Sequence, residues 1–345
     1  MSTPDHNTRI LLDSRPHGEP TPDNFRFETV PVPAPAEGEV LLRTIYLSLD
    51  PYMRGRMNDA KSYAAPVELG AVMEGGTVCE VVESRDPGLA PGDIVLAHGG
   101  WQEYAVAPAR QVRRLDPARA PISTAVGVLG MPGFTAYAGL LEIGRPQPGE
   151  TVVVAAAAGP VGSTVGQIAR IKGARAVGIA GGADKVAWLE ELGFDVALDH
   201  RSPTFRDDLE AAVPDGIDVY FENVGGHVWD AVLPRLNTYA RVPVCGLVSH
   251  YNETELPAGP DRSSRLMTAI LTRSLTVRGF IQNEFVSSHY KAFQADAAGW
   301  IADGSLRYKE DIVAGLDNAP DAFLGMLKGQ NFGKLVVQVG ADPTS

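Results

Sequence analysis

The 345-residue sequence has few of the features that mark secreted, membrane or nucleic-acid-binding proteins. Its two cysteines, Cys79 and Cys245, cannot build a disulfide framework. It has no apolar run long enough to cross a bilayer, and the opening MSTPDHNTRI lacks the regions of a signal peptide. The net charge of −12 disfavours nucleic acid and anionic membranes as partners. We therefore expect a globular cytoplasmic protein.

A recognisable metal site is also missing. The seven histidines show no metal-type spacing, and no Gly-His-Glu run occurs. A zinc dehydrogenase needs thiolates or imidazoles gathered from several places, so we expect no metal. Hydrogen bonds alone must then stabilise negative charge on oxygen. This favours reduction of a C=C bond conjugated to a carbonyl, with hydride added at the β-carbon, over alcohol oxidation.

Residues 151–185 carry the strongest pattern in the chain. A β-branched strand, Thr151–Val154, is followed by small residues, a helical pattern that ends near Gly173, and a second strand over 174–180. The turn between strand and helix contains Gly159, Pro160, Val161 and Gly162. Small residues there let a pyrophosphate reach the N–H groups at the helix start. The stretch predicts a dinucleotide-binding βαβ unit; the alternative is a tight turn that binds nothing.

The end of the second strand indicates which dinucleotide binds. An NAD site usually has an acidic residue there, whereas this chain has Gly181, Gly182 and Ala183, then Asp184 and Lys185. The missing carboxylate removes repulsion against a 2′-phosphate, and Lys185 can supply positive charge. The pattern favours NADP. Asp184 argues against it, and a solvated Lys185 in a first helical turn is the alternative.

The rest of the chain divides into a β-rich part and an alternating part. Short strands before the motif predict a barrel-like β domain; they are expected at 25–30, 40–45, 73–82, 93–97 and 101–106. Residues 131–137 look like a break between helices. Strands and helices then alternate as in a doubly wound parallel sheet; the strands are expected at 196–199, 217–222, 240–246 and 275–280, and the helices at 205–213, 227–236, 265–272 and 287–302. The tail, with a helix at 319–327 and a strand at 334–339, is expected to return to the first domain.

Loops at the carboxyl ends of these strands contain the candidate reactive groups. Tyr251 is the candidate hydroxyl donor to an enolate oxygen, with His250 as the second choice. Either one could instead be an ordinary loop residue. Tyr251 could be an aromatic side chain that packs against the other domain, and His250 could be an exposed histidine. Asn223 could bind the nicotinamide ribose or simply favour a turn. In the β domain, Tyr52 is expected to line the substrate pocket.

Residues 49–56 are expected to form a loop, in which two arginines follow Tyr52. Arg54 and Arg56 could hold an acidic substrate tail. Arginines in such positions more often make structural ion pairs.

Ordered matches along nearly the whole chain resemble a known family. They are LSLDPYMRGRM from Leu47, GMPGFTAYAGLLEIG from Gly130, AAAAGPVGSTVGQIARIKGA from Ala155, EELGFDVALDH from Glu190, YFENVGG from Tyr220, CGLVSHYN from Cys245, RGFIQNEF from Arg278 and GQNFGKLVVQV from Gly329. The chain resembles zinc-independent medium-chain dehydrogenases/reductases. Within them it is similar to the branch of prostaglandin reductases, alkenal double-bond reductases and curcumin-reductase-like enzymes.

The resemblance implies an α/β fold with a GroES-like domain, residues 1–130 and 306–345, and a Rossmann NADP-binding domain, residues 131–305. It implies NADPH-dependent reduction of α,β-unsaturated ketones or aldehydes, and often a homodimer. Gly159 to Gly162 would meet the pyrophosphate and Lys185 the 2′-phosphate. The other implied cofactor contacts are His200, Asn223, Cys245, Gly246, Ser249, Tyr251, Phe280, Ile281, Gln282 and Asn331. Tyr251 would hold the enolate oxygen together with a ribose hydroxyl, and Tyr52 and Tyr251 would contact the substrate.

The sequence departs from the family pattern at two places. His200 stands where the family usually has a tyrosine, and Gly181-Gly182-Ala183-Asp184 replaces Gly-Ser-x-Glu. Two other functions stay open. One is a zinc-free quinone oxidoreductase, against which the matches at Tyr251 and in the segment from Leu47 argue. The other is a protein that binds NADP without useful turnover.

Overall fold

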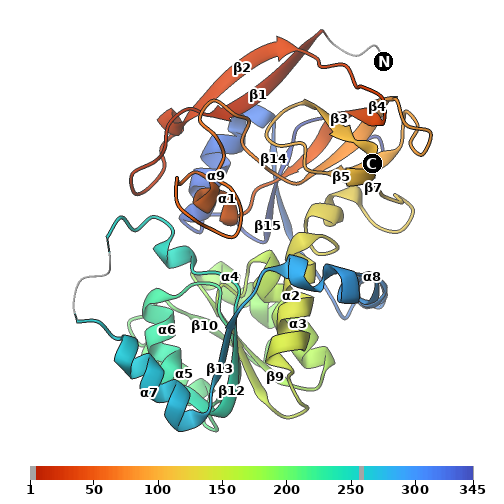
Figure 1. Cartoon of the computed structure of the whole chain (residues 1–345). Coiled ribbons are helices and arrows are strands. Elements are labelled where there is room, and N and C mark those ends of the chain that lie inside the picture. Colours follow the sequence, from red (N-terminus) through yellow and green to blue (C-terminus); the bar gives the residue numbers. More distant parts are fainter. Residues whose placement is uncertain (1–4, 256–259, 345) are drawn as a thin grey trace. The chain divides into compact units, whose positions relative to one another are not determined.

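The computed structural model describes residues 5–255 and 260–344 (Figure 1). The chain separates into two units. One comprises Met1–Gly127 and Glu310–Ser345, and the other comprises Val128–Lys309. The expected divisions were 1–130 with 306–345, and 131–305.

The first unit is built on a sheet with the strand order β14-β15-β3-β4-β5-β7, and β6 also pairs with β3. Its strands are β3 (Glu39–Ser48), β4 (Thr77–Ser84), β5 (Ile94–Ala97), β6 (Tyr104–Pro108), β7 (Arg113–Arg114), β14 (Glu310–Ala314) and β15 (Lys334–Gln338). A separate hairpin joins β1 (His6–Leu12) to β2 (Phe25–Pro31). The chain's last strand, β15, runs antiparallel to β3, so residues from both ends of the sequence share one sheet.

Aromatic side chains fill the core of this unit. Trp101 is fully buried and stacks on Phe25, with 5.5 Å between the ring centroids. Phe323, on helix α9 (Ala319–Leu327), meets Trp101 edge to face at 5.6 Å. The segment after β3, expected to be a loop, forms the short helix α1 (Tyr52–Arg56).

The second unit contains the predicted doubly wound parallel sheet, which is confirmed. Its order is β10-β9-β8-β11-β12-β13, with all pairs parallel. The strands are β8 (Thr151–Val154), β9 (Arg175–Ala180), β10 (Val196–Asp199), β11 (Ile217–Phe221), β12 (Leu236–Val244) and β13 (Thr276–Gly279). The order reverses between β8 and β11, where such sheets bind their ligands.

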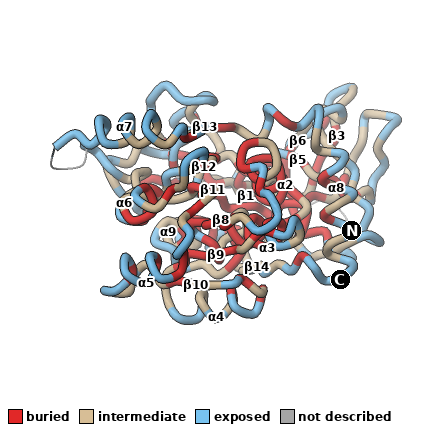
Figure 2. Tube along the Cα trace, turned by 90° about the horizontal axis from the view of Figure 1, so that it is seen from below, coloured by how far each residue is buried: buried red, intermediate tan, exposed pale blue. Residues whose placement is uncertain are grey.

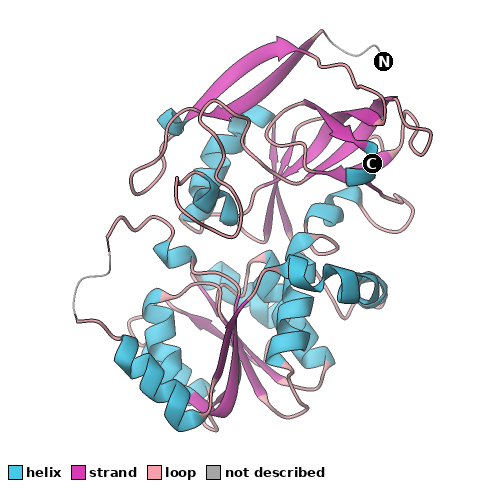
Figure 3. Ribbon diagram, viewed as in Figure 1, coloured by secondary structure: helices cyan, strands magenta, loops and turns pink. Residues whose placement is uncertain are grey.

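Helices cover both faces of this sheet (Figure 3). The central strand β8 shows why, since Val152 and Val154 belong to one apolar cluster while Val153 belongs to the other. The helices are α2 (Met131–Ala138), α3 (Pro160–Ile171), α4 (Ala183–Glu191), α5 (Phe205–Ala212), α6 (Gly226–Val232), α7 (Ser263–Arg273) and α8 (Val286–Ala302). Figure 2 shows burial concentrated along the strands, while α7 is largely exposed.

Three local expectations were wrong. Residues 131–137 are no break but helix α2, because Pro132 lies in the first turn, where its missing N–H costs nothing. Residues 73–76 precede β4 rather than form part of it. Strand β12 begins at Leu236, earlier than expected, and reaches its parallel register through an irregularity near Tyr239, which has a φ of +65°.

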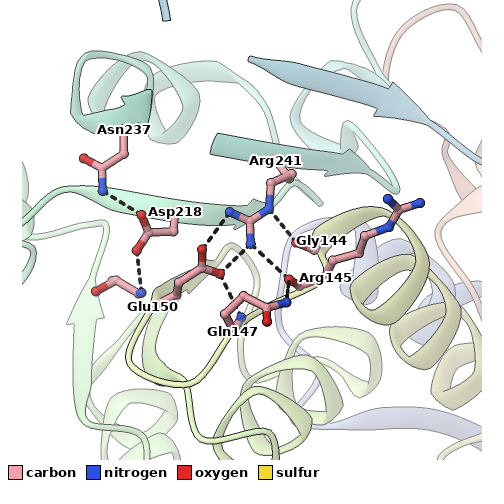
Figure 4. A network of polar contacts seen from close by, with 8 residues as sticks. Gly144, Arg145, Gln147, Glu150, Asp218, Asn237 and Arg241 are labelled. Carbon is pink, nitrogen blue, oxygen red and sulfur yellow. Dashed lines mark hydrogen bonds and ion pairs between the residues drawn. The ribbon is translucent and has the colours of Figure 1, made fainter. Parts of the chain in front are cut away.

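A polar network holds the amino end of the sheet (Figure 4). Arg241 donates to both carboxylate oxygens of Glu150, at 3.0 and 2.5 Å, and to the carbonyl of Gly144 at 2.8 Å. Asp218 accepts hydrogen bonds from the backbone N–H of Thr151 and the side chain of Asn237, both at 2.8 Å. The network thus stabilises the end of the sheet opposite to the carboxyl ends of its strands, where the predicted site residues lie.

Candidate functional site

The turn between β8 and α3 is shaped for an anion. Ala156 has a φ of +51°, and its carbonyl accepts the N–H of Gly159 at 3.0 Å. A Cβ at Gly162 would overlap that carbonyl oxygen and lie 2.7 Å from the Cα of Ala157. Helix α3 begins after Gly159 without a side-chain cap. Its first N–H groups and its dipole therefore suit a phosphate, so the residues present fit a dinucleotide.

The end of β9 lies beside a cluster of basic side chains. A Cβ at Gly181 would lie 2.8 Å from Nε2 of His200 and 2.9 Å from Nε of Arg201. The N–H groups of Arg201 and Gly182 hydrogen-bond to the carboxylate of Asp199, and they keep its pKa low although burial acts to raise it. Arg201 is not among the site residues predicted from the sequence. Its place just after β10, the parallel neighbour of β9, was the available signal.

The predicted phosphate contact Lys185 lies in the first turn of α4 and is half-buried. Asp184 precedes it on the exposed side of the same turn. Gly182 is the residue before the helix and has a φ of +98°, a conformation suited to glycine. Lys185 thus shares the carboxyl end of β9 with Arg201 and His200.

The loop after β11 is fastened to the phosphate turn. The side-chain amide of Asn223 donates to the carbonyl of Ala155 at 2.8 Å. The carboxylate of the buried Glu222 accepts the N–H groups of Val224 and Gly225, at 2.7 and 2.9 Å, and the hydroxyl of Tyr220 at 3.1 Å. Burial raises the pKa of Glu222 above its usual value, and these hydrogen bonds oppose the rise.

The loop after β12 brings Tyr251 back over the sheet edge. A Cβ at Gly246 would lie 3.1 Å from the hydroxyl oxygen of Tyr251. The backbone carbonyl of Glu222 accepts the N–H of Cys245 at 2.9 Å and that of Gly246 at 3.2 Å, while the Ser249 hydroxyl donates to the carbonyl of Val224 at 2.5 Å. The two loops are therefore one connected structure that positions the Tyr251 hydroxyl.

The other predicted residues of this region have partners close by in the chain or in the same unit. The imidazole of His250 accepts the N–H of Gly226 at 3.3 Å and contacts Glu253 at 2.7 Å. Phe280, just past β13, is buried with its ring 6.1 Å from that of Phe221. Ile281 and Gln282 follow at the carboxyl end of β13, where the N–H of Ile281 donates to Glu284 at 2.9 Å.

The first unit contains the remaining candidates. Arg56 forms an ion pair with Glu74 at 2.7 Å, and its guanidinium lies 5.7 Å from the ring centre of Tyr52 and 4.5 Å from that of Tyr63. Burial, followed by the nearby Asp50 and Glu74 charges, raises the pKa of Tyr52.

Two further side chains of this unit bond within it. The side chain of Arg54 donates to Asn58 at 2.6 Å and to the carbonyl of Gly18 at 2.7 Å. Arg54 and Arg56 thus have structural roles. The amide of Asn331 donates to the carbonyl of Gly333 at 2.9 Å.

Comparison with known proteins identifies the family. Residues 8–115 match the N-terminal domain of oxidoreductase, and residues 160–299 match the zinc-binding dehydrogenase family. The chain is 55% identical to the NADPH-dependent curcumin reductase of Escherichia coli strain K12 over 97% of its own length and 98% of that protein. The chain belongs to the zinc-independent curcumin reductase and prostaglandin reductase branch of the medium-chain dehydrogenases/reductases.

Two further relatives fit this reductase branch. Prostaglandin reductase 1 of Oryctolagus cuniculus is 41% identical over 92% of this chain and 89% of that protein. The crystal structure of CurA in complex with NADPH from Vibrio vulnificus has a TM-score of 0.95 and 52% identity, covering 97% of this chain and 100% of that one. The family model over 160–299 has zinc in its description, yet the described residues include no group of three or more metal-ligating side chains.

No helix among the described residues is long and apolar enough to span a membrane.

Proposed function

We propose that this chain reduces the C=C bond of α,β-unsaturated ketones or aldehydes with NADPH. The observation that carries the proposal is the Tyr251 hydroxyl beside Gly246, at the carboxyl end of β12, on a sheet whose phosphate turn fits a dinucleotide. The 55% identity to an NADPH-dependent curcumin reductase and the family membership support it. NADP(H) is the cofactor and the chain is an oxidoreductase acting on CH–CH groups.

Each part of the site has one task. The bound cofactor supplies the hydride. The N–H groups at the start of α3 hold the pyrophosphate, and Lys185 supplies positive charge for the 2′-phosphate. Asn223 and the Cys245–Tyr251 loop orient the nicotinamide half. The Tyr251 O–H donates a hydrogen bond to the substrate carbonyl oxygen, together with a ribose hydroxyl, and this bond strengthens as the oxygen gains enolate charge.

The remaining contacts complete the proposal. Phe280, Ile281 and Gln282 follow β13 at the same sheet edge and contact the nicotinamide half, and Asn331 is a further cofactor contact. Tyr52 contacts the substrate. From the family we expect a homodimer located in the cytoplasm. Sedimentation of the purified protein as a monomer would contradict the homodimer.

Absorbance of NADPH and NADH, followed with a panel of enones, alkenals and quinones, tests the function. We expect enone turnover that is fast with NADPH and slow with NADH. Tyr251→Phe should lower kcat by about 10²-fold, the usual cost of one lost donor to an oxyanion. Tyr239→Phe is the matched control, since Tyr239 is 70% exposed at the irregularity in β12.

Three results would count against the proposal. Turnover of quinones without enones would favour a quinone oxidoreductase. NADPH binding with no turnover would favour a non-catalytic protein. Unchanged enone kinetics in Tyr251→Phe would remove the role of its hydroxyl.

A further inference from the structure

A pair of histidines lies at the end of β9, next to an arginine. Nδ1 of His200 and Nε2 of His227 are 3.2 Å apart, and Nε2 of His200 lies over Gly181. The guanidinium of Arg201 adjoins Gly181 and Gly182 and has no ion-pair partner among the described residues. The three side chains come from the turn after β10 and from the start of α6.

The position of this cluster has a meaning in a dinucleotide site. The residues directly after the second strand face the 2′ position of the adenosine ribose, and an arginine there accommodates a 2′-phosphate. Gly181 and Gly182 are these residues, and neither has a side chain to separate the ribose from the cluster. Arg201 and His200 are thus the side chains nearest to the backbone that a 2′-phosphate would approach.

We propose that the His200–His227 pair, with Arg201, forms a proton-linked 2′-phosphate site, in which His200 takes up a proton when the phosphate binds. The inference rests on the proposed NADP function. Arg201 supplies constant charge, whereas His200 supplies a charge that depends on pH. His227 is a positioning residue, because it acts on the phosphate only through His200.

The contact between the two imidazoles explains why His200 would take up a proton. Only one of two neutral imidazoles can donate in the contact between Nδ1 of His200 and Nε2 of His227. A protonated His200 donates from both nitrogens, from Nδ1 to Nε2 of His227 and from Nε2 to a phosphate oxygen. The proton comes from solvent, and no bond other than these hydrogen bonds forms or breaks.

The surroundings keep His200 neutral until an anion arrives. Burial, then the neighbouring His227 and Arg201, lower the pKa of His200, and Asp199 opposes them. The elements around it carry further titratable groups. Asp184 and Lys185 lie in the first turn of α4, Asp207 and Asp208 in the first turn of α5, and Asp230 on α6. A dianionic phosphate favours the imidazolium and raises the pKa of His200 in the complex. Affinity for the phosphate is then highest below both pKa values of His200 and is lost as pH rises between them.

The experiment compares 2′,5′-ADP with 5′-AMP by calorimetry from pH 6.5 to 8.5, using the full chain. The two nucleotides differ only in the 2′-phosphate. We expect the dissociation constant of 5′-AMP divided by that of 2′,5′-ADP to fall with rising pH, by up to about tenfold per pH unit for one linked proton. Runs in buffers of different ionisation enthalpy should show proton uptake with 2′,5′-ADP in excess of that with 5′-AMP.

Variants separate His200 from the phosphate itself, which also titrates, with a pKa of about 6. In His200→Gln the preference for 2′,5′-ADP should persist through Arg201 and Lys185, but its decline with pH and the excess proton uptake should vanish. His227→Gln should reduce the proton uptake. His17→Gln, an exposed histidine of the other unit, is the control.

The outcomes distinguish two failures. A pH slope that is the same in His200→Gln as in the parent chain would overturn the proton linkage while leaving the NADP function intact. Equal binding of 2′,5′-ADP and 5′-AMP by the parent chain would overturn the phosphate site and, with it, the proposed cofactor preference. Circular dichroism of each variant would detect unfolding, and His200→Tyr, the family's usual residue, gives a second folded variant without a titrating imidazole.

Discussion

The side-chain amide of Asn223 donates a hydrogen bond of 2.8 Å to the backbone carbonyl of Ala155. These residues follow β11 and β8, the neighbouring strands between which the strand order reverses. The bond therefore spans the point where a doubly wound sheet binds its ligand. It joins the phosphate turn to the loop that carries Glu222 and supports Tyr251.

Asn223→Asp should weaken NADPH binding about tenfold. An aspartate has no N–H to donate, and its charge would face the carbonyl oxygen of Ala155 across the same gap. Calorimetric titration with NADPH measures the effect. The control is Asn237→Asp, because Asn237 lies in the network at the amino end of the sheet (Figure 4) and donates to Asp218. That variant should lose stability and keep its NADPH affinity; an equal loss of affinity in both would refute the local role of Asn223.

Gly162→Ala should destabilise the chain and weaken its cofactor binding. The new Cβ would overlap the carbonyl oxygen of Ala156, which belongs to the backbone and cannot rotate away. Overpacking of this kind costs about 1–3 kcal/mol. Gly299→Ala is the matched control, since nothing lies within 4 Å of a Cβ there, in the interior of α8. Alanine in a helix interior should stabilise it by about 0.5–1 kcal/mol, so thermal unfolding of the two variants should shift in opposite directions.

The sequence predicted the dinucleotide unit well because its signals are local. A β-branched strand, a turn of small residues and an apolar helical period occur within residues 151–180, and β8, α3 and β9 lie there. The break expected at 131–137 failed because a proline inside a pattern reads as an interruption, whereas at a helix start it is favourable.

Contacts between distant segments could not be predicted from the sequence. Arg201 reaches Gly181 only because β10 and β9 pair in a register that brings Asp199 opposite Ala180. His200 and His227 are 27 residues apart in the sequence, and they come into contact because the fold places the turn after β10 beside the start of α6. Arg54 and Arg56 had two open interpretations, and only their partners, Asn58 and Glu74, decide in favour of the structural one.

Glu222 should make the stability of the chain depend on pH. Burial raises its pKa above the usual 4.5, so the folded state holds this proton more tightly than the unfolded state. The contribution of Glu222 to the free energy of unfolding is therefore greatest below about pH 4.5, and it declines as pH rises towards the raised pKa. Glu222→Gln should remove that decline, because the amide keeps an oxygen for the N–H groups of Val224 and Gly225 and carries no charge.

Urea denaturation between pH 5 and 8 measures this contribution. The difference in unfolding free energy between the parent chain and Glu222→Gln should change with pH. As pH rises, the variant should become more stable relative to the parent. Glu253→Gln, which alters an exposed carboxylate, is the control and should run parallel to the parent over this range. A constant difference for Glu222→Gln would show that this carboxyl has the same pKa folded and unfolded.

The two cysteines should resist the substrates that this reductase is proposed to process. Enones and enals are electrophiles that add to thiolates, and the thiolate is the reactive form. Burial raises the pKa of Cys79 to about 11 and, followed by the charge of Glu222, that of Cys245 to about 12. At pH 8 roughly one Cys79 thiol in a thousand, and fewer for Cys245, would be ionised.

We therefore expect the folded chain to react with an alkenal or with iodoacetamide far more slowly than the chain in urea, where both thiols are ordinary. Mass spectrometry after timed labelling at pH 8 measures both rates. Cys245 is the sharper test, because it is only partly buried and its loop leads to Tyr251. Rapid labelling of Cys245 in the folded chain would mean that its thiol ionises readily. Bound NADPH should then be tested for protection, since a reactive thiol in this loop would expose the enzyme to inactivation by its own substrate.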